Sequence, residues 1–140
     1  MSLSNSPEHN TINSIRNSKF NITIFYLDSL SSINVTNQNM SLINVKFEPL
    51  TVRGIGGEET CSESGRFKDK FEGLRFHFLK TCHFNIVGLT KLEERFTVVK
   101  NDSCFVCTSK LNPNCVVVFD RDDYGFYSYR CCLVNDETDP

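Results

Sequence analysis

Apolar and polar residues alternate along most of the chain from residue 20 onward. The stretch Phe20–Tyr26 alternates and is rich in β-branched and aromatic residues, which favours a strand. The same criteria predict strands at 31–36, 42–47, 74–78, 82–86, 95–99, 103–109, 115–120 and 124–134. Short polar turns separate the later strands at a spacing of about 10–12 residues, which is typical of an antiparallel meander. We therefore predict an all-β or mainly β fold with eight or nine strands.

A few segments interrupt this alternation. Residues 66–72 have apolar positions on one helical face, and they predict a short helical turn before the strand at 74–78. Thr90 and Glu93 have the spacing of a capping box, which predicts a second short helical turn. Pro49 is expected to end the third strand or to mark a sheet edge. Gly54–Gly57 predicts a flexible turn and lacks the spacing of a phosphate-binding loop.

The strand count is compatible with two architectures. An antiparallel up-and-down barrel of about eight strands can close around side chains or one small ligand. A β-sandwich has the same alternation and stays an alternative. We expect a flexible N-terminal segment at 1–18, a single β domain at 19–134 and a C-terminal tail at 135–140.

Alternation also indicates which large side chains turn inward. In a barrel, six of them are candidates for contact with a ligand: Phe76, Phe78, Phe84, Phe96, Tyr124 and Phe126. The alternative for each is that it fills a solid core, because Phe is abundant and Trp is absent.

Seven cysteines in 140 residues is a high content for a chain without a metal or redox motif. It favours an oxidising compartment and a disulfide-stapled domain, although buried thiols in a reduced protein are the alternative. The candidates for disulfides are Cys61, Cys82, Cys104, Cys107, Cys115, Cys131 and Cys132. An odd number leaves at least one thiol free or paired with another chain, and the connectivity stays open. The Cys104/Cys107 spacing lacks a second pair suited to zinc, so we expect no metal site there.

Four sequons occur, at Asn21, Asn34, Asn39 and Asn101, where about two or three would arise by chance. They agree with a secreted glycoprotein. The first residues have neither the basic nor the apolar region of a signal peptide, so we expect a mature form with an added starter Met.

Charge and residue chemistry exclude several functions. The net charge of −2 gives no support for binding nucleic acid. There is no run of about 18 apolar residues that would span a membrane. No nucleophile, base and orienting group can be named together among the histidines and cysteines, and the acidic turn at 120–123 lacks the EF-hand pattern. We therefore expect no enzyme activity, no metal and no cofactor.

The stretch from Val116 to Cys131 resembles a lipocalin signature. In that family two late barrel strands meet at a turn with Asp and Tyr, and the second strand ends in Tyr-x-Cys. Asp120–Asp123 occupy the corresponding turn here, and Tyr129-Arg130-Cys131 supplies the ending. Cys104 and Cys115 also look like the strand cysteines of arthropod salivary lipocalins. The family's Gly-x-Trp and its C-terminal helix have no counterpart. The resemblance implies an eight-stranded barrel with a ligand cavity.

Two functions follow as hypotheses. The first is a secreted, non-catalytic carrier that sequesters a small hydrophobic or aromatic ligand by apolar burial and tyrosine hydroxyl contacts. The alternative is an extracellular protein-recognition module, such as an immune-modulating or receptor-binding β-sandwich, which acts through its surface. Its candidate surface is the Gly54–Gly57 loop with residues 58–73.

Overall fold

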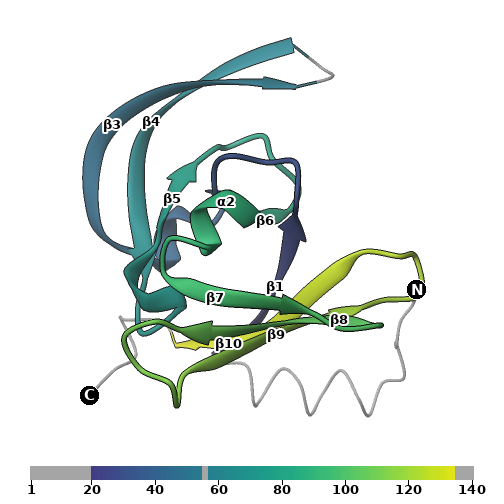
Figure 1. Cartoon of the computed structure of the whole chain (residues 1–140). Coiled ribbons are helices and arrows are strands. Elements are labelled where there is room, and N and C mark those ends of the chain that lie inside the picture. The colour runs from purple at the N-terminus through teal and green to yellow at the C-terminus, as the bar shows by residue number, and fades with distance from the viewer. Residues whose placement is uncertain (1–19, 55–56, 135–140) are drawn as a thin grey trace, which may run out of the picture. The chain divides into compact units, whose positions relative to one another are not determined.

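A computed structural model describes residues 20–54 and 57–134 of the chain (Figure 1). The chain divides into two compact units, which we describe separately. The larger unit is Ile24–Arg130, and the smaller unit is Met1–Thr23 with Cys131–Pro140. Thr23 and Leu133 are buried residues of the smaller unit.

The described residues are mainly β-structure. The strands are β1 (Phe20–Asp28), β2 (Val35–Thr36), β3 (Leu42–Gly54), β4 (Gly57–Phe67), β5 (Arg75–Phe78), β6 (Asn85–Gly88), β7 (Phe96–Lys100), β8 (Cys104–Ser109), β9 (Val116–Arg121) and β10 (Tyr127–Val134). Short helical turns lie at η1 (Asn39–Ser41), η2 (Phe71–Gly73) and α2 (Leu89–Leu92). The prediction of a mainly β fold is confirmed.

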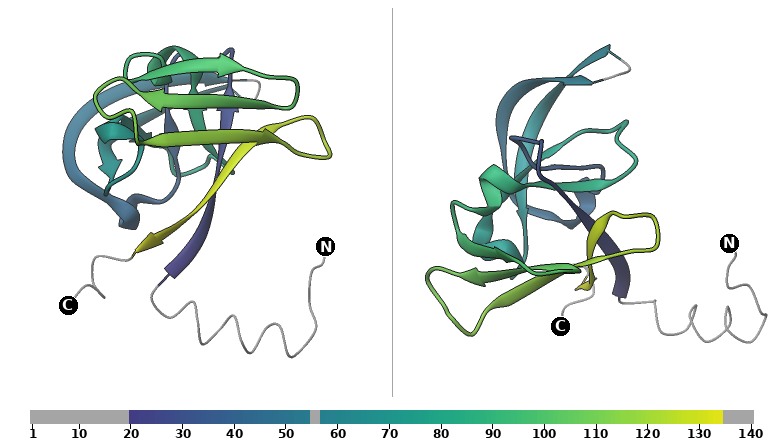
Figure 2. Two further views of the ribbon diagram at one scale, coloured as in Figure 1. Left: turned by 60° about the horizontal axis from the view of Figure 1, so that its bottom comes forward. Right: turned by 45° about the vertical axis from the view of Figure 1, so that its right-hand side comes forward.

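The strands form one sheet in the order β3-β4-β5-β2-β6-β1-β10-β9-β8-β7. Figure 2 shows the green strands β7, β8 and β9 side by side. Two antiparallel blocks, β3-β4-β5 and β7-β8-β9-β10, make up most of it. Between them, β2 pairs in parallel with β5, and β6 pairs in parallel with β1. The predicted antiparallel meander is therefore correct for the second block and wrong for the centre of the sheet.

The sheet is not closed in the described part of the chain. β3 and β7 stand at the two ends of the strand order and do not pair with each other. A closed up-and-down barrel of eight strands is therefore not formed. Alternation follows from one face of a strand being buried, so it is the same in an open sheet and in a barrel.

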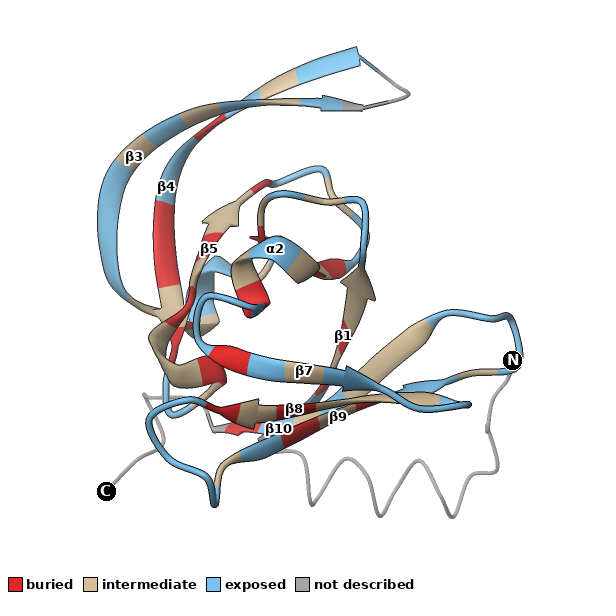
Figure 3. Cartoon of the chain, in the orientation of Figure 1, coloured by how far each residue is buried: buried red, intermediate tan, exposed pale blue. Residues whose placement is uncertain are grey.

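The core consists largely of phenylalanine rings. Phe25 on β1 packs edge-to-face against Phe67, Phe71 and Phe76, with centroid distances of 5.0, 4.9 and 5.7 Å. Phe119 on β9 stacks on Phe71 at 6.4 Å. All five rings are buried (Figure 3). Edge-to-face contacts of this kind add to the free energy gained by burying the rings.

Several boundaries differ from the predictions. β4 was not predicted, because most of its residues are polar, its buried and exposed positions do not alternate regularly, and it begins with Gly57. β3 continues through Pro49 to Gly54, and Pro49 lies at a register irregularity of this end strand. The expectation that Pro49 marks an edge is thus correct, since an edge strand tolerates the missing N–H.

The helical turns are shorter than predicted or differently capped. The turn expected at 66–72 is the single 3-10 turn η2, and Phe71 and Glu72 have positive φ angles of 54° and 51°. The turn near Thr90 exists as α2, but Gly88 is its N-cap and no side chain caps it. The capping box is therefore wrong.

No two of the seven cysteines lie at bonding distance from each other, although all seven are described residues. The predicted disulfides are not formed in this structure. One reason is visible on β8, where Cys104 faces Asp120 across the ladder and Cys107 faces Val117 and Val98. Neighbouring strands thus offer these thiols no cysteine partner.

The four sequons differ in their environments. Asn34 is buried, and its Nδ2 donates a 3.0 Å hydrogen bond to the carbonyl oxygen of Arg75. A glycan attached to that nitrogen would have to replace this hydrogen bond, so the structure disfavours modification of Asn34. Asn39 and Asn101 are exposed. The side chain of Asn21 lies outside the described residues.

Candidate functional site

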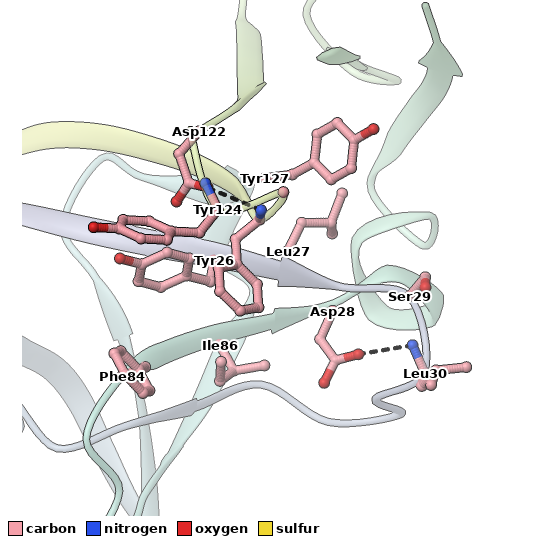
Figure 4. Close-up of a pocket in the computed structure, with 12 residues that line it drawn as sticks. Tyr26, Leu27, Asp28, Ser29, Leu30, Phe84, Ile86, Asp122, Tyr124 and Tyr127 are labelled. Atoms are coloured by element: carbon pink, nitrogen blue, oxygen red, sulfur yellow. Dashed lines mark hydrogen bonds between the residues drawn. The ribbon is translucent and has the colours of Figure 1, made fainter. Parts of the chain in front are cut away.

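An open pocket of about 610 Å³ lies beside β1 and β6 (Figure 4). β1 and the turn after it contribute residues 26–30, Phe84 lies just before β6, and Ile86 lies on β6. The loop between β9 and β10 contributes Asp122 and residues 124–126, and Tyr127 is the first residue of β10. Three segments far apart in the sequence therefore meet at one site. A second hollow of about 410 Å³ beside β9 and β10 is smaller and has a single aromatic ring, Tyr129.

Successive side chains of β1 point to opposite faces of the strand, so that neighbouring residues contribute to the core and to the pocket. Phe25 is fully buried among the core rings, whereas Tyr26 lines the pocket. In the parallel pairing of β1 with β6, Tyr26 stands opposite Ile86. Residues paired across neighbouring strands project to the same face of the sheet, and both Ile86 and Tyr26 line the pocket.

The pocket lining includes five aromatic residues, Tyr26, Phe84, Tyr124, Phe126 and Tyr127. Tyr26 contacts Phe84 at a centroid distance of 5.4 Å and Phe126 at 6.2 Å, with interplanar angles of 82° and 83°. Phe84, Phe126 and Tyr124 are 57%, 61% and 86% exposed. Large apolar rings left in water at a concave surface are typical of binding sites.

The loop that carries Tyr124 and Phe126 is held by Asp122. Its Oδ1 accepts hydrogen bonds from the backbone N–H groups of Tyr124 and Phe126, both at 2.9 Å. The carbonyl oxygen of Asp122 accepts the N–H of Gly125 at 3.1 Å. Gly125 has φ of +89°, a conformation that glycine adopts without the steric cost of a side chain. This loop is therefore fixed by its own hydrogen bonds before any ligand is present.

Asp28 plays the corresponding role at the end of β1. Its Oδ1 accepts the backbone N–H of Leu30 at 2.9 Å (Figure 4). Asp28 and Asp122 are the charged side chains of the pocket lining, and no Lys, Arg or His is among the described residues that line it. The hydroxyl groups of Tyr26, Tyr124 and Tyr127 supply further polar atoms at the pocket.

The structure gathers half of the predicted ligand-binding residues at this pocket. Phe84, Tyr124 and Phe126 line it. Phe76 and Phe96 are buried in the core, in agreement with the alternative stated for them. Phe78 lies half-buried on β5 and is not part of the lining.

Sequence reasoning missed the contribution of β1. Tyr26 and Asp28 alternate with the apolar residues Phe25 and Leu27, and this signal marks a second face on the strand. It did not identify the segments that pack beside that face, because the β1–β6 pairing joins residues about 60 positions apart.

The described thiols and histidines do not form a reactive centre at the pocket. Burial raises the pKa of Cys107 to about 12, and it also raises the pKa of Cys61 and Cys82. Burial raises the pKa of Cys115 as well, with the Glu72 carboxyl adding to the effect. A high pKa disfavours the thiolate, which is the nucleophilic form.

Two further properties concern the described part of the chain. Within residues 20–54 and 57–134, no three His, Cys, Asp or Glu side chains are grouped so that they could hold a metal ion. In the same residues, no helix has both the length and the apolar character needed to cross a membrane.

No protein-family model matches the chain, and no curated protein matches it.

Proposed function

We propose that this chain is a non-catalytic binding protein that holds a small apolar or aromatic ligand in the pocket between β1, β6 and the β9–β10 loop. The observation that carries the proposal is the set of exposed rings around a concave space of about 610 Å³. Ligand pockets of proteins usually have volumes of roughly 300–1,000 Å³ and combine apolar walls with a few polar groups. The tyrosine hydroxyls and the two carboxylates are such groups here.

The proposed site lies outside the phenylalanine core rather than in a barrel interior. The rings of Phe25, Phe67 and Phe76 pack against one another and fill the space between the strands. A carrier related to the lipocalins stays a proposal based on the resemblance of residues 116–131. Part of that stretch, Asp122 to Tyr127, forms one wall of the pocket.

We further propose that the protein acts outside the cell. The cysteine content supports this location, and the exposed sequons at Asn39 and Asn101 are compatible with it. The disulfides that we expected remain part of this proposal, since they depend on an oxidising environment.

The alternative function is recognition of another protein through the β3–β4 hairpin. The observation that favours it is the exposure of Phe47, at 77%, and of Val45 on β3, which is an end strand of the sheet. An end strand has a row of backbone N–H and C=O groups that can pair with another chain. Figure 1 shows this hairpin as the long curved pair of strands.

The test of the ligand-binding proposal uses the neutral fluorescent probe N-phenyl-1-naphthylamine. We expect the folded protein to enhance its fluorescence in a saturable manner. Replacing both Phe84 and Phe126 by Ala removes two aromatic rings of the pocket lining. This double variant should bind the probe at least about tenfold more weakly, since burying one ring contributes roughly 1.5–3 kcal/mol.

The control is Phe47→Ala, which removes another exposed phenylalanine ring that lies outside the pocket. It should leave probe binding unchanged. Binding that is absent, or equal in all three proteins, contradicts the proposal.

A further inference from the structure

We infer that the ligand of the proposed pocket carries a protonated amine attached to an aromatic or apolar body. This inference rests on the proposed function and adds the charge of the ligand to it. The charged side chains of the lining are Asp28 and Asp122, and both are acidic. A cationic group is therefore attracted to the pocket, whereas a carboxylate of a fatty acid is repelled.

The two carboxylates are oriented in advance. Oδ1 of Asp28 accepts the N–H of Leu30, and Oδ1 of Asp122 accepts the N–H groups of Tyr124 and Phe126. Oδ2 of each carboxylate takes no part in these hydrogen bonds. A ligand ammonium group can thus donate to an acceptor whose side chain is already ordered, which lowers the entropic cost of binding.

The aromatic wall has the geometry that favours a cation. The ring of Tyr26 is nearly perpendicular to the rings of Phe84 and Phe126, so the three rings form corners rather than one flat surface. The face of an aromatic ring is electronegative, and it attracts a cation placed over it within about 6 Å. The same rings bind the uncharged body of the ligand by apolar contact.

One basic group lies close to the loop. Nη2 of Arg121 is 3.9 Å from the position that a Cβ atom on Gly125 would occupy. Arg121 is not part of the lining. Its charge offsets part of the field of the carboxylates, so we expect a preference for cations of about tenfold rather than of several orders of magnitude.

The experiment compares three probes with the same ring: tryptamine, indole and indole-3-propionate. Because the chain contains no Trp, the indole fluorescence of the probe is observed without tryptophan emission from the protein. Equilibrium dialysis gives the affinity of each probe for the wild type. It is repeated for Asp28→Asn, for Asp122→Asn, and for the control Asp69→Asn, which changes an exposed carboxylate outside the pocket.

Asparagine keeps the Oδ1 acceptor, so each pocket variant removes the charge and preserves the turn. We expect tryptamine to bind about tenfold more tightly than indole, and indole-3-propionate to bind more weakly than indole. Each pocket variant should weaken tryptamine about threefold to fivefold without changing the affinity for indole, and Asp69→Asn should change neither. The preference should also shrink at 1 M salt.

The outcomes separate the two proposals. If all three probes bind equally, or the anion binds most tightly, the inference on charge is wrong and the proposed pocket stands. If the preference for tryptamine survives both pocket variants, the carboxylates do not cause it and the inference is overturned. If neither indole nor tryptamine binds and N-phenyl-1-naphthylamine also fails to bind, the proposed function itself falls.

Discussion

Asp122 and Phe126 are connected by two hydrogen bonds in opposite directions. The N–H of Asp122 donates to the carbonyl oxygen of Phe126 at 2.7 Å, and the N–H of Phe126 donates to Oδ1 of Asp122 at 2.9 Å. The side chain of Asp122 thus completes the closed loop that presents Tyr124 and Phe126 at the pocket.

Asp122→Ala should destabilise the fold and disorder the pocket wall. It removes an acceptor used by two backbone N–H groups, and the expected loss is about 1–2 kcal/mol of unfolding free energy. Asp122→Asn keeps that acceptor and should lose less than about 0.5 kcal/mol. Urea unfolding of the three proteins measures the difference. Equal stability of the Ala and Asn variants would show that the side-chain hydrogen bonds do not hold the loop.

Truncation of Phe25 should mainly reduce stability, whereas truncation of Tyr26 should mainly reduce probe binding, because the two side chains lie on opposite faces of β1. Phe25→Ala leaves a cavity among buried rings and should cost about 3–5 kcal/mol. Tyr26→Ala should cost roughly 1 kcal/mol and should abolish most binding of N-phenyl-1-naphthylamine. Unfolding curves and probe titrations on both variants check this pair. A larger stability loss for Tyr26→Ala would mean that the faces of β1 are assigned wrongly.

Because of His77, the free energy of unfolding should decrease as the pH is lowered through the mildly acidic range. Its pKa is lowered chiefly by burial, with the charges of Lys91 and Arg75 acting in the same direction and Glu48 opposing them. Because the folded state disfavours the imidazolium, the unfolded chain binds more protons below the unfolded pKa of about 6.5. Stability is therefore complete above that pH, and it is lost as the pH falls toward the lowered folded value.

The measurement is the unfolding free energy of the wild type and of His77→Phe at pH 7.5 and pH 5.5. The variant removes the titrating group and should show a smaller decrease than the wild type. An identical decrease in both proteins would assign the pH dependence to other groups.

Cys61 and Cys82 are the pair that we expect to join under oxidising conditions. Both belong to one apolar cluster around Val35 and Leu79, and burial raises the pKa of Cys82, with a smaller contribution in the same direction from the charge of Cys61. With glutathione disulfide, the two thiols would give up two electrons and two protons, and two glutathione thiols would be released. Closing a loop of about 20 residues should add roughly 3 kcal/mol to stability.

Non-reducing peptide mapping before and after oxidation identifies the bond. Since burial raises both thiol pKa values, the reaction should speed up as the pH is raised. A Cys61→Ser variant should lose the stabilisation by glutathione disulfide. Mapping that finds Cys82 bonded to another cysteine would contradict this pairing.

The sequence predicted the antiparallel block well, because β7 to β10 are joined by short polar turns and each strand pairs with its neighbour in the chain. It did not predict β4, whose Glu-rich and Ser-rich residues are largely exposed on a long hairpin. Nor did it predict the parallel pairs, since a pairing between Tyr26 and Ile86 depends on how the intervening segments fold. Local alternation contains no information on that choice.

The candidate site was likewise predicted only in part from the sequence. Phe84, Tyr124 and Phe126 were predicted from alternation to turn toward a ligand inside a barrel, and the structure brings them together at an open pocket. Phe76 and Phe96 have the same alternation in the sequence, but they lie in the core. Alternation predicts which side chains share a face of a strand, and it does not predict which segments pack on that face. Tyr26, Asp28 and Asp122 were not predicted as pocket residues, because the alternation does not show which segments lie beside them.

Residues 26–30, 84–86 and 122–127 come together only when the chain is folded, so an unfolded chain has no such pocket. Any occupant therefore shifts the equilibrium toward the native state, and it raises the melting temperature by an amount that grows with the logarithm of its concentration relative to its Kd. A library of amines and neutral aromatic compounds can thus be ranked by thermal shift alone, before the natural occupant is identified.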